Sequence, residues 1–133
     1  MTIDTYINRK YKTALEILKP LAEKGNADAQ NYLGEIHRKG HGVLPDYREA
    51  FKWYKKAAEQ GKATAQFNLG KSYGEGLGVP QDHVEAATWL LKSAEQKSSG
   101  ARRLLRESYY QWIKQVAEQG DSYAQRFLGE SYY

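Results

Sequence analysis

Three histidines are the first residues in this 133-residue chain that could do chemistry. His37 and His41 are four residues apart, a spacing that on one continuous helix would offer two imidazoles to a metal ion. Gly40 lies between them and indicates a helix end, and the chain has no cysteine and no third histidine nearby to complete tetrahedral ligation. We therefore predict no metal and no other cofactor, with His37 in a core, His41 in a loop and His83 facing solvent.

A phosphate-binding motif is the second candidate. Residues 65–72 read AQFNLGKS, which fits the looser form of the phosphate-loop pattern in which alanine replaces the first glycine. That chemistry needs a strand, then a loop of exposed N–H groups, then a helix. No strand is predicted before Ala65, and both Ala65 and Gly70 recur in an earlier stretch that continues with different residues. We therefore predict no nucleotide site.

Carboxylates are plentiful, but their positions suggest structural roles. Asp46 and Asp82 precede predicted helices, and Glu59 and Glu95 lie in similar helix ends. The chain contains no G-x-S-x-G nucleophile motif. We therefore predict that the protein is not an enzyme and has no catalytic residues. A hydrolase that uses a carboxylate–histidine pair in a groove is the alternative.

Charge and hydropathy limit the partner classes. The 20 basic and 16 acidic residues give a formal net charge of +4, and glutamate alternates with lysine along most of the chain. Because nucleic-acid binding requires basic residues clustered on one face, no nucleic-acid partner is expected. No apolar run approaches ~18 residues, so we expect no membrane insertion. The expected compartment is the cytoplasm, or the periplasm if a leader was removed.

A repeated phrase organises the elements that carry these residues. Residues 40–53 read GHGVLPDYREAFKW, and residues 76–89 read GLGVPQDHVEAATW. Likewise, residues 25–37 read GNADAQNYLGEIH, and residues 61–73 read GKATAQFNLGKSY. Both pairs are 36 residues apart, and a period between about 20 and 50 residues is typical of a repeat array. The spacing of apolar residues predicts two helices per unit, joined by a glycine-rich loop.

Single letters of the unit have predictable roles in these helices. Gly34 and Gly70 fall inside the first helix of each unit, where glycine costs up to about 1 kcal/mol relative to alanine, so we expect another helix to approach closely there. Asp46 and Asp82 are predicted N-caps of the second helices, each followed three residues later by a glutamate, as in a capping box. Pro20 predicts a kink or a tightened turn near the end of the first helix of the chain.

The third copy departs from the pattern. Ala101 and Gln119 bound a stretch with no glycine or proline, and apolar residues recur every three or four positions across the place where the loop is missing. This predicts a single helix of about 19 residues in place of a hairpin. Trp53, Trp89 and Trp112 share one repeat position and are predicted to pack in the core.

The repeated letters resemble a known family. The pattern A-x-A-Q-x-x-L-G-x-x-Y-x-x-G-x-G-V-x-x-D-x-x-x-A-x-x-W, with His37 at the first Tyr position, is similar to the Sel1-like repeat, a relative of the tetratricopeptide repeat. The resemblance implies an all-α fold, a right-handed α-solenoid of antiparallel helix pairs with about seven to eight helices. It also implies a non-catalytic protein-interaction module, commonly a bacterial adaptor. A toxin-neutralising immunity protein is a more specific version that the residues do not select.

The repeat register divides one predicted domain, residues 1–133, into five parts. Residues 1–25 form an N-terminal half unit, 26–61 repeat 1, 62–97 repeat 2, 98–120 a shortened repeat 3, and 121–133 a C-terminal half unit.

Recognition is expected at the positions that the repeat does not determine. By analogy with tetratricopeptide helices, the first helix of each unit lines a concave face that binds a protein or peptide, and its exposed aromatic and charged residues are typical of such a groove. An ordinary charged solvent face is the alternative at any one of these positions. The predicted partner-binding residues are Asn31, Glu35, Arg38, Phe67, Lys71, Arg103, Glu107, Tyr123 and Arg126, and Asp28, Thr64 and Glu130 lie on the same predicted face.

Overall fold

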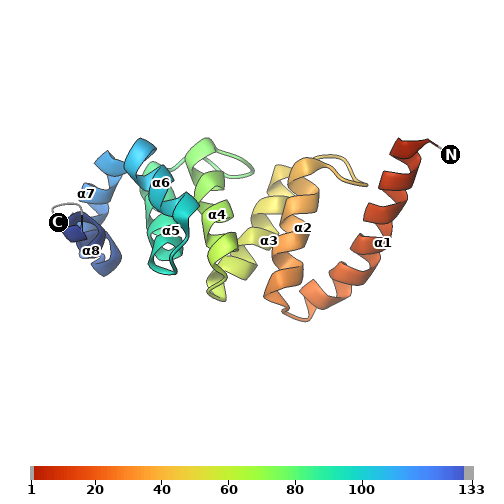
Figure 1. Cartoon of the computed structure of the whole chain (residues 1–133), viewed down its shortest axis with the longest axis horizontal. Helices are drawn as coiled ribbons and strands as arrows, with labels where there is room; N and C mark the ends of the chain where they lie inside the picture. The colour runs from red at the N-terminus through yellow and green to blue at the C-terminus, as the bar shows by residue number, and fades with distance from the viewer. Residues whose placement is uncertain (1, 131–133) are drawn as a thin grey trace.

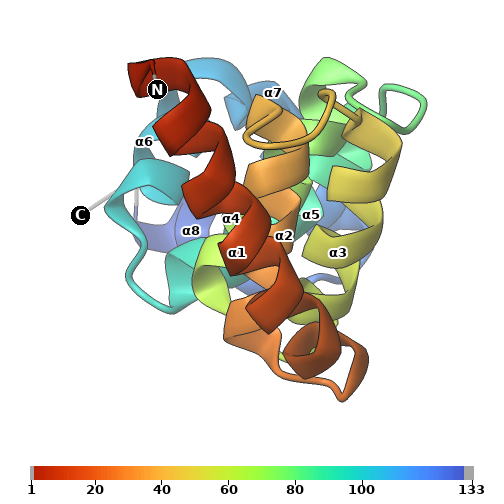
Figure 2. The same ribbon diagram turned by 90° about the vertical axis from the view of Figure 1, so that its right-hand side faces the viewer.

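The computed structural model describes residues 2–130, which form eight α-helices and no strand. The helices follow one another along the long axis of the molecule, and viewed along that axis α3 and α5 lie to one side of α2 and α4 (Figures 1 and 2). The predicted all-α solenoid of antiparallel helix pairs is confirmed. The helices are α1 (Ile3–Glu23), α2 (Ala27–Lys39), α3 (Tyr47–Glu59), α4 (Ala63–Glu75), α5 (His83–Glu95), α6 (Ser99–Ser108), α7 (Tyr110–Glu118) and α8 (Ser122–Glu130).

The glycines inside α2 and α4 are contact points for the second helix of each pair. A Cβ atom added at Gly34 would lie 2.5 Å from Cε1 of Tyr54 in α3, and one added at Gly70 would lie 2.8 Å from Cγ of Leu90 in α5. Tyr54 and Leu90 are themselves fully buried. The predicted close approach of a neighbouring helix at these two glycines is therefore confirmed.

The aspartate caps also form, but the capping box is only half made. Asp46 accepts a hydrogen bond from the backbone N–H of Glu49 at 3.1 Å. The carboxylate of Glu49 does not return this bond, because it accepts from the indole N–H of Trp53 at 3.1 Å. The Asp46 N–H instead donates to the carbonyl of His37 at 2.8 Å. Each second helix is thus joined to the first helix of its own unit, and Asp82, Glu85, Trp89 and Tyr73 repeat the arrangement in the next unit.

A buried glutamine joins each unit to the one before it. The side-chain amide of Gln30 donates to the carbonyl of Ala22 at 3.0 Å, and that of Gln66 donates to the carbonyl of Ala58 at 3.3 Å. Both carbonyls lie in the last turn of a helix, where backbone acceptors have no partner within the helix. The glutamine of the repeat pattern is therefore a side-chain cap for the preceding helix. Arg102 on Ala94 and Gln125 on Ala117 make the corresponding bonds in later units.

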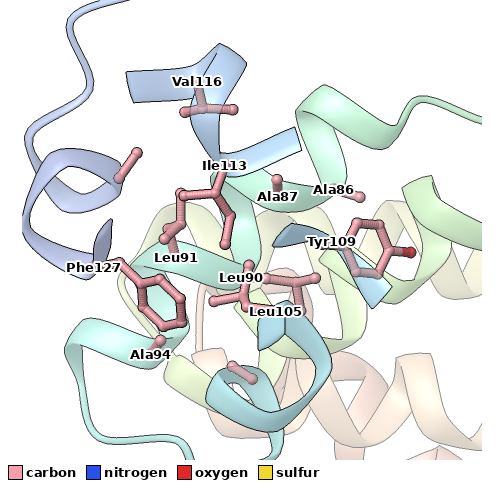
Figure 3. Close-up of a cluster of buried hydrophobic side chains, with 12 residues drawn as sticks. Ala86, Ala87, Leu90, Leu91, Ala94, Leu105, Tyr109, Ile113, Val116 and Phe127 are labelled. Atoms are coloured by element: carbon pink, nitrogen blue, oxygen red, sulfur yellow. The ribbon is translucent and has the colours of Figure 1, made fainter. Parts of the chain in front are cut away.

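The predicted single helix over residues 101–119 is wrong. α6 ends at Ser108 and α7 begins at Tyr110, and between them Tyr109 has φ −121° and ψ 7°, outside the helical region. The break allows Leu105 of α6 and Ile113 of α7 both to be fully buried against α5 (Figure 3). Apolar spacing could not reveal the break, because the 3–4 period is the same on both sides of it.

Two of the three histidines stack on aromatic rings. His83 was predicted to face solvent, and this is wrong: its ring is half-buried and stacks on Trp112 of α7 at 4.9 Å between ring centroids. Its Nδ1 atom is buried with no hydrogen-bond partner in residues 2–130. His41 stacks on Tyr11 at 4.2 Å, in the loop where it was predicted, and His37 is half-buried rather than fully enclosed. Among the described residues, no group of three potential metal ligands occurs.

The first and last helices, α1 and α8, follow the predicted repeat register. α1 continues through Pro20 to Glu23, and its ribbon bends in the last turns (Figure 1). α8 begins a further first helix in the predicted C-terminal half unit, of which residues 131–133 lie outside the described residues. Trp53 is buried, and Trp89 and Trp112 are partly buried against the core clusters, as predicted for these tryptophans.

No helix in residues 2–130 combines the length and hydropathy needed to cross a bilayer.

The turn after α5 offers a test of backbone strain. Lys97 has φ 69°, in the left-handed region, at the place where the corresponding turns have Gly25, Gly61 and Gly120. A non-glycine residue in that region costs roughly 1–2 kcal/mol, partly offset by the entropy that glycine loses on folding. Lys97→Gly should therefore stabilise the protein and raise its Tm by ~2–5 °C in a thermal melt.

Gly61→Ala is the matched control, because an added Cβ there would meet no atom within 4 Å and tests the backbone conformation alone. It should lower the stability by about 1 kcal/mol. A lower Tm for Lys97→Gly would contradict the assignment of strain to this turn.

Candidate functional site

A groove lies between α2 and α4, on the face formed by the first helices of the two complete units. Its volume is about 620 Å³. Both helices present side chains to it from positions that the two repeats do not share. The lining residues are Asp28, Asn31, Tyr32, Glu35, Lys62, Thr64, Phe67 and Asn68.

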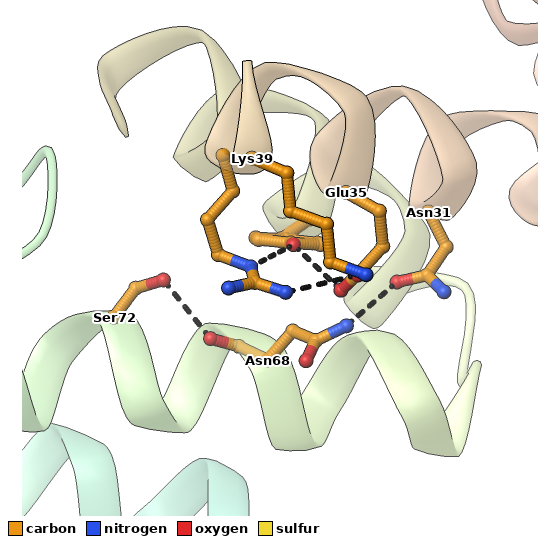
Figure 4. Close-up of polar contacts among 7 residues, drawn as sticks. Asn31, Glu35, Lys39, Asn68 and Ser72 are labelled. Carbon is orange, nitrogen blue, oxygen red and sulfur yellow. Dashed lines mark hydrogen bonds and ion pairs between the residues drawn. The ribbon is translucent and has the colours of Figure 1, made fainter. Parts of the chain in front are cut away.

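Two asparagines join the helices across the groove. The side-chain amide of Asn68 donates to Oδ1 of Asn31 at 3.2 Å, and Asn31 is 8% exposed (Figure 4). One turn further along α4, the hydroxyl of Ser72 donates to the carbonyl of Asn68 at 2.9 Å. Asn31 was predicted to contact a partner, and the structure gives it a bond within the fold.

Two aromatic side chains flank these asparagines. Tyr32 is 61% exposed, and Phe67 is half-buried with the Lys71 ammonium 5.6 Å from its ring centroid, within the range of a cation–π contact. Tyr32 was missed in the sequence, although a signal was present. The first unit reads Asn31-Tyr32 where the second reads Phe67-Asn68, so the aromatic residue and the asparagine exchange places.

An ion pair closes the groove at one end. The Lys62 ammonium, at the N-cap of α4, lies 2.5 Å from Oδ1 of Asp28 in the first turn of α2. Both side chains are partly exposed, so this pair contributes little to stability. Lys62 was not among the predicted residues, because it occupies a position close to a helix boundary in the sequence.

At the other end of the groove, the phenol of Tyr54 joins two predicted residues. Tyr54 donates its O–H to Glu35 at 2.9 Å and accepts from Nε of Arg38 at 3.2 Å, while Arg38 also bonds Glu35 at 3.0 Å (Figure 4). Lys39 adds its ammonium 3.4 Å from the same carboxylate. This carboxylate–phenol–guanidinium network holds the side chains of Glu35 and Arg38 in place.

The network shifts the pKa of its members. Burial alone would raise the pKa of Glu35, but hydrogen bonds from Tyr54 and Arg38, together with the positive charges of Arg38 and Lys39, outweigh burial and lower it. For Tyr54, burial is the largest cause, and with the adjacent Glu35 carboxylate it raises the pKa of the phenol well above its usual range. The phenol therefore remains a hydrogen-bond donor at any physiological pH.

The structure brings together only some of the predicted residues. Asn31, Glu35 and Phe67 share the groove, and Arg38 and Lys71 line a smaller pocket beside it. The remaining four residues occupy the far end of the solenoid. Arg103 and Glu107 form an exposed ion pair on α6 at 3.1 Å, and Arg126 pairs with Glu95 of α5 next to Tyr123. The side chain of Glu130 lies outside the described residues.

The Glu35 network predicts a pH dependence of stability. Because the folded-state pKa of Glu35 lies below its ordinary value of 4.5, the ionised carboxylate stabilises the fold fully above that pH, and this contribution is lost as the pH falls through the lowered folded-state pKa. Glu35→Gln should therefore cost about 1 kcal/mol at pH 7 and progressively less in more acidic solution, as measured by urea unfolding.

The matched control is Glu107→Gln, whose ion pair with Arg103 is exposed. Its unfolding free energy should change little at any pH. A Glu35→Gln cost that stays constant from pH 7 to pH 3 would contradict the role of this carboxylate.

Comparison with known proteins identifies the family. The model of the Sel1 repeat matches residues 27–62 and 63–98, which together make up more than half of the chain. A Sel1 repeat protein from Oxalobacter formigenes has a crystal structure with a TM-score of 0.69 and 38% sequence identity, over 92% of this chain and 56% of that one. A protective antigen present in uropathogenic Escherichia coli strains, with an SLR fold, gives a TM-score of 0.70 and 34% identity, over 89% of this chain and 28% of that one.

The chain spans 56% and 28% of the lengths of the two structural relatives. A comparison with curated proteins gave no match. Sel1 repeats generally mediate protein–protein interactions on a scaffold that is typically non-catalytic. The two matched repeats and the similarity of the fold lead to one conclusion: the chain belongs to the Sel1 repeat family.

Proposed function

We propose that the protein binds a segment of a partner protein in the α2–α4 groove, with Tyr32 and Phe67 as the main anchors. The observation that supports this is the placement of two aromatic rings beside a preformed groove of about 620 Å³. Aromatic residues are enriched where binding energy concentrates in protein interfaces. Tyr32 is 61% exposed, so most of its side chain is accessible to a partner.

The walls of the groove favour a peptide. Asn31 and Asn68 use one hydrogen-bonding group each in their mutual bond, so Nδ2 of Asn31 and Oδ1 of Asn68 remain for the backbone of an extended segment. The groove also presents both signs of charge, from Asp28 and Lys62 at one end and Glu35 at the other. These groups fix orientation more than they add affinity.

Preorganisation supports the same function. Glu35 and Arg38 are already held by Tyr54, so a partner would not have to order them. Interfaces that need less ordering lose less conformational entropy on binding. We propose Glu35 and Arg38 as orienting residues at the edge of the site, and Arg103, Glu107, Tyr123 and Arg126 as contacts only for a partner long enough to reach the far end of the solenoid.

The experiment starts from peptides selected from a random 12-residue display library against the wild-type protein. Their affinities are then measured for Tyr32→Ala and Phe67→Ala by titration calorimetry. Each variant should bind groove-directed peptides at least tenfold more weakly, because loss of a central aromatic anchor typically costs 2 kcal/mol or more. The circular dichroism spectrum of each variant should remain helical.

Tyr110→Ala provides the matched control. Tyr110 is an exposed tyrosine on α7, 44% exposed, and it does not line the groove. Its loss should change affinity by less than about twofold, as for surface positions away from an anchor. Equal losses for Tyr32→Ala and Tyr110→Ala, or unchanged binding by both groove variants, would refute the groove as the site. Toxin neutralisation would be one instance of such binding.

A further inference from the structure

A second pocket lies on the other side of α2, between α1, α2 and α3. Its volume is about 250 Å³, and it is separate from the groove because the two share no lining residue. Apolar side chains form most of its wall, with three polar side chains among them. The lining residues are Leu15, Lys19, Leu33, His37, Val43, Glu49 and Trp53.

The repeat register gives each of these residues a counterpart 36 positions later. Five of the seven counterparts are the same amino acid, namely Lys55, Leu69, Val79, Glu85 and Trp89. The other two differ: Leu15 corresponds to Phe51, and His37 corresponds to Tyr73. At both positions the first unit has the smaller side chain. The same wall therefore surrounds two large rings in the second unit and two smaller side chains in the first.

The second unit shows what these walls accommodate. Phe51 and Tyr73 pack edge to face, with ring centroids 5.2 Å apart and an interplanar angle of 88°. This is a preferred geometry for two aromatic rings. Burial, followed by the charges of Glu85, Asp82 and Glu59, raises the pKa of the Tyr73 phenol. A phenol in this position thus lies near the carboxylate that corresponds to Glu49 in the first unit.

In the first unit the corresponding carboxylate, Glu49, is available as a hydrogen-bond acceptor for a phenol. Oε1 of Glu49 accepts from the indole N–H of Trp53 at 3.1 Å and from Lys52 at 3.4 Å. Within residues 2–130, Oε2 of Glu49 makes no hydrogen bond. The side chain of Glu49 is 35% exposed, so this oxygen can be reached.

From the register and the geometry we propose that this pocket binds a neutral phenol ring. The ring occupies the space that Phe51 and Tyr73 fill in the second unit, its faces contact Leu15 and Trp53, and its hydroxyl donates to Glu49. The proposal is independent of partner binding in the groove, because it uses different residues on a different side of α2. A free phenol and the side chain of a tyrosine on another molecule present the same chemistry.

The test titrates p-cresol, the side-chain analogue of tyrosine, into the wild-type protein labelled with ¹⁵N. The indole N–H signal of Trp53 and the amide signals of Leu33 and Val43 should shift in a saturable way, with Kd about 1 mM for a ligand of this size. Cyclohexanol, similar in size but not aromatic, should bind at least fivefold more weakly. A second titration uses N-acetyl-tyrosinamide: saturable shifts would show that the pocket admits a tyrosine of a peptide, and shifts with p-cresol alone would restrict it to free phenols.

Two reciprocal double variants serve as controls. Leu15→Phe with His37→Tyr fills the pocket with the rings of the second unit, so p-cresol affinity should fall at least tenfold while the Tm rises. Phe51→Leu with Tyr73→His opens the matching space in the second unit, and p-cresol should then shift the indole signal of Trp89 as well. His37→Tyr alone replaces the filled variant if that variant does not fold.

Two results would overturn the proposal. Wild-type signals that do not saturate with p-cresol, or shifts that are as large in a folded, filled variant, would show that no ring binds in this space. Loss of peptide binding in the groove variants would not affect these signals, so failure here and failure of the proposed groove are distinguishable.

Discussion

The contact between a glycine in one helix and a large side chain in the next is the constraint on which the rest of the structure depends. Gly34 and Gly70 leave no room for a Cβ beside Tyr54 and Leu90. Glycine at a helix centre is otherwise unfavourable, so its presence is balanced by the packing of the partner helix. In the first unit this contact also has a polar consequence. The ring that passes over Gly34 places its hydroxyl between Glu35 and Arg38, at the edge of the groove.

Hydrogen bonds from repeated side chains then fix the stacking of the units. Gln60 donates to the carbonyl of Gly25 at 2.9 Å and to the side chain of Gln30 at 2.9 Å, and Gln96 repeats this bond pair on Gly61 and Gln66. Because each buried glutamine amide is satisfied, a shift of one unit against the next would leave polar groups unpaired, at a cost of about 1–3 kcal/mol each. The shared glutamines therefore fix how the units stack, and the residues that line the groove are letters that the two repeats do not share.

This division explains which features the sequence could predict. Helix pairs, aspartate N-caps and close-approach glycines follow from letters that recur and were predicted correctly, whereas the glutamate half of the capping box does not form. The break at Tyr109 does not recur, and it leaves the apolar period unchanged, so only the backbone angles of Tyr109 in the structure reveal it. The stacking of His83 on Trp112 was also missed, because it joins two residues that are 29 positions apart and that no repeat pattern pairs. The sequence did not predict Tyr32 as a groove residue, because the groove is formed by residues of two helices whose relative placement the sequence pattern does not give.

Because the two units share one backbone, a residue that differs between them changes the space or the contacts at a single place. When two sites have the same walls, a smaller side chain in one of them leaves space rather than a rearranged core, because packed interiors relax only in part. Leu15 and His37 in place of Phe51 and Tyr73 are such a case, and the space lies beside Trp53. The exchange of Asn31-Tyr32 for Phe67-Asn68 has a different effect, since it allows the two asparagines to pair and adds one aromatic residue from each helix to the groove lining. Both candidate sites are therefore produced by substitutions within the repeat, and no departure from the solenoid is needed to form them.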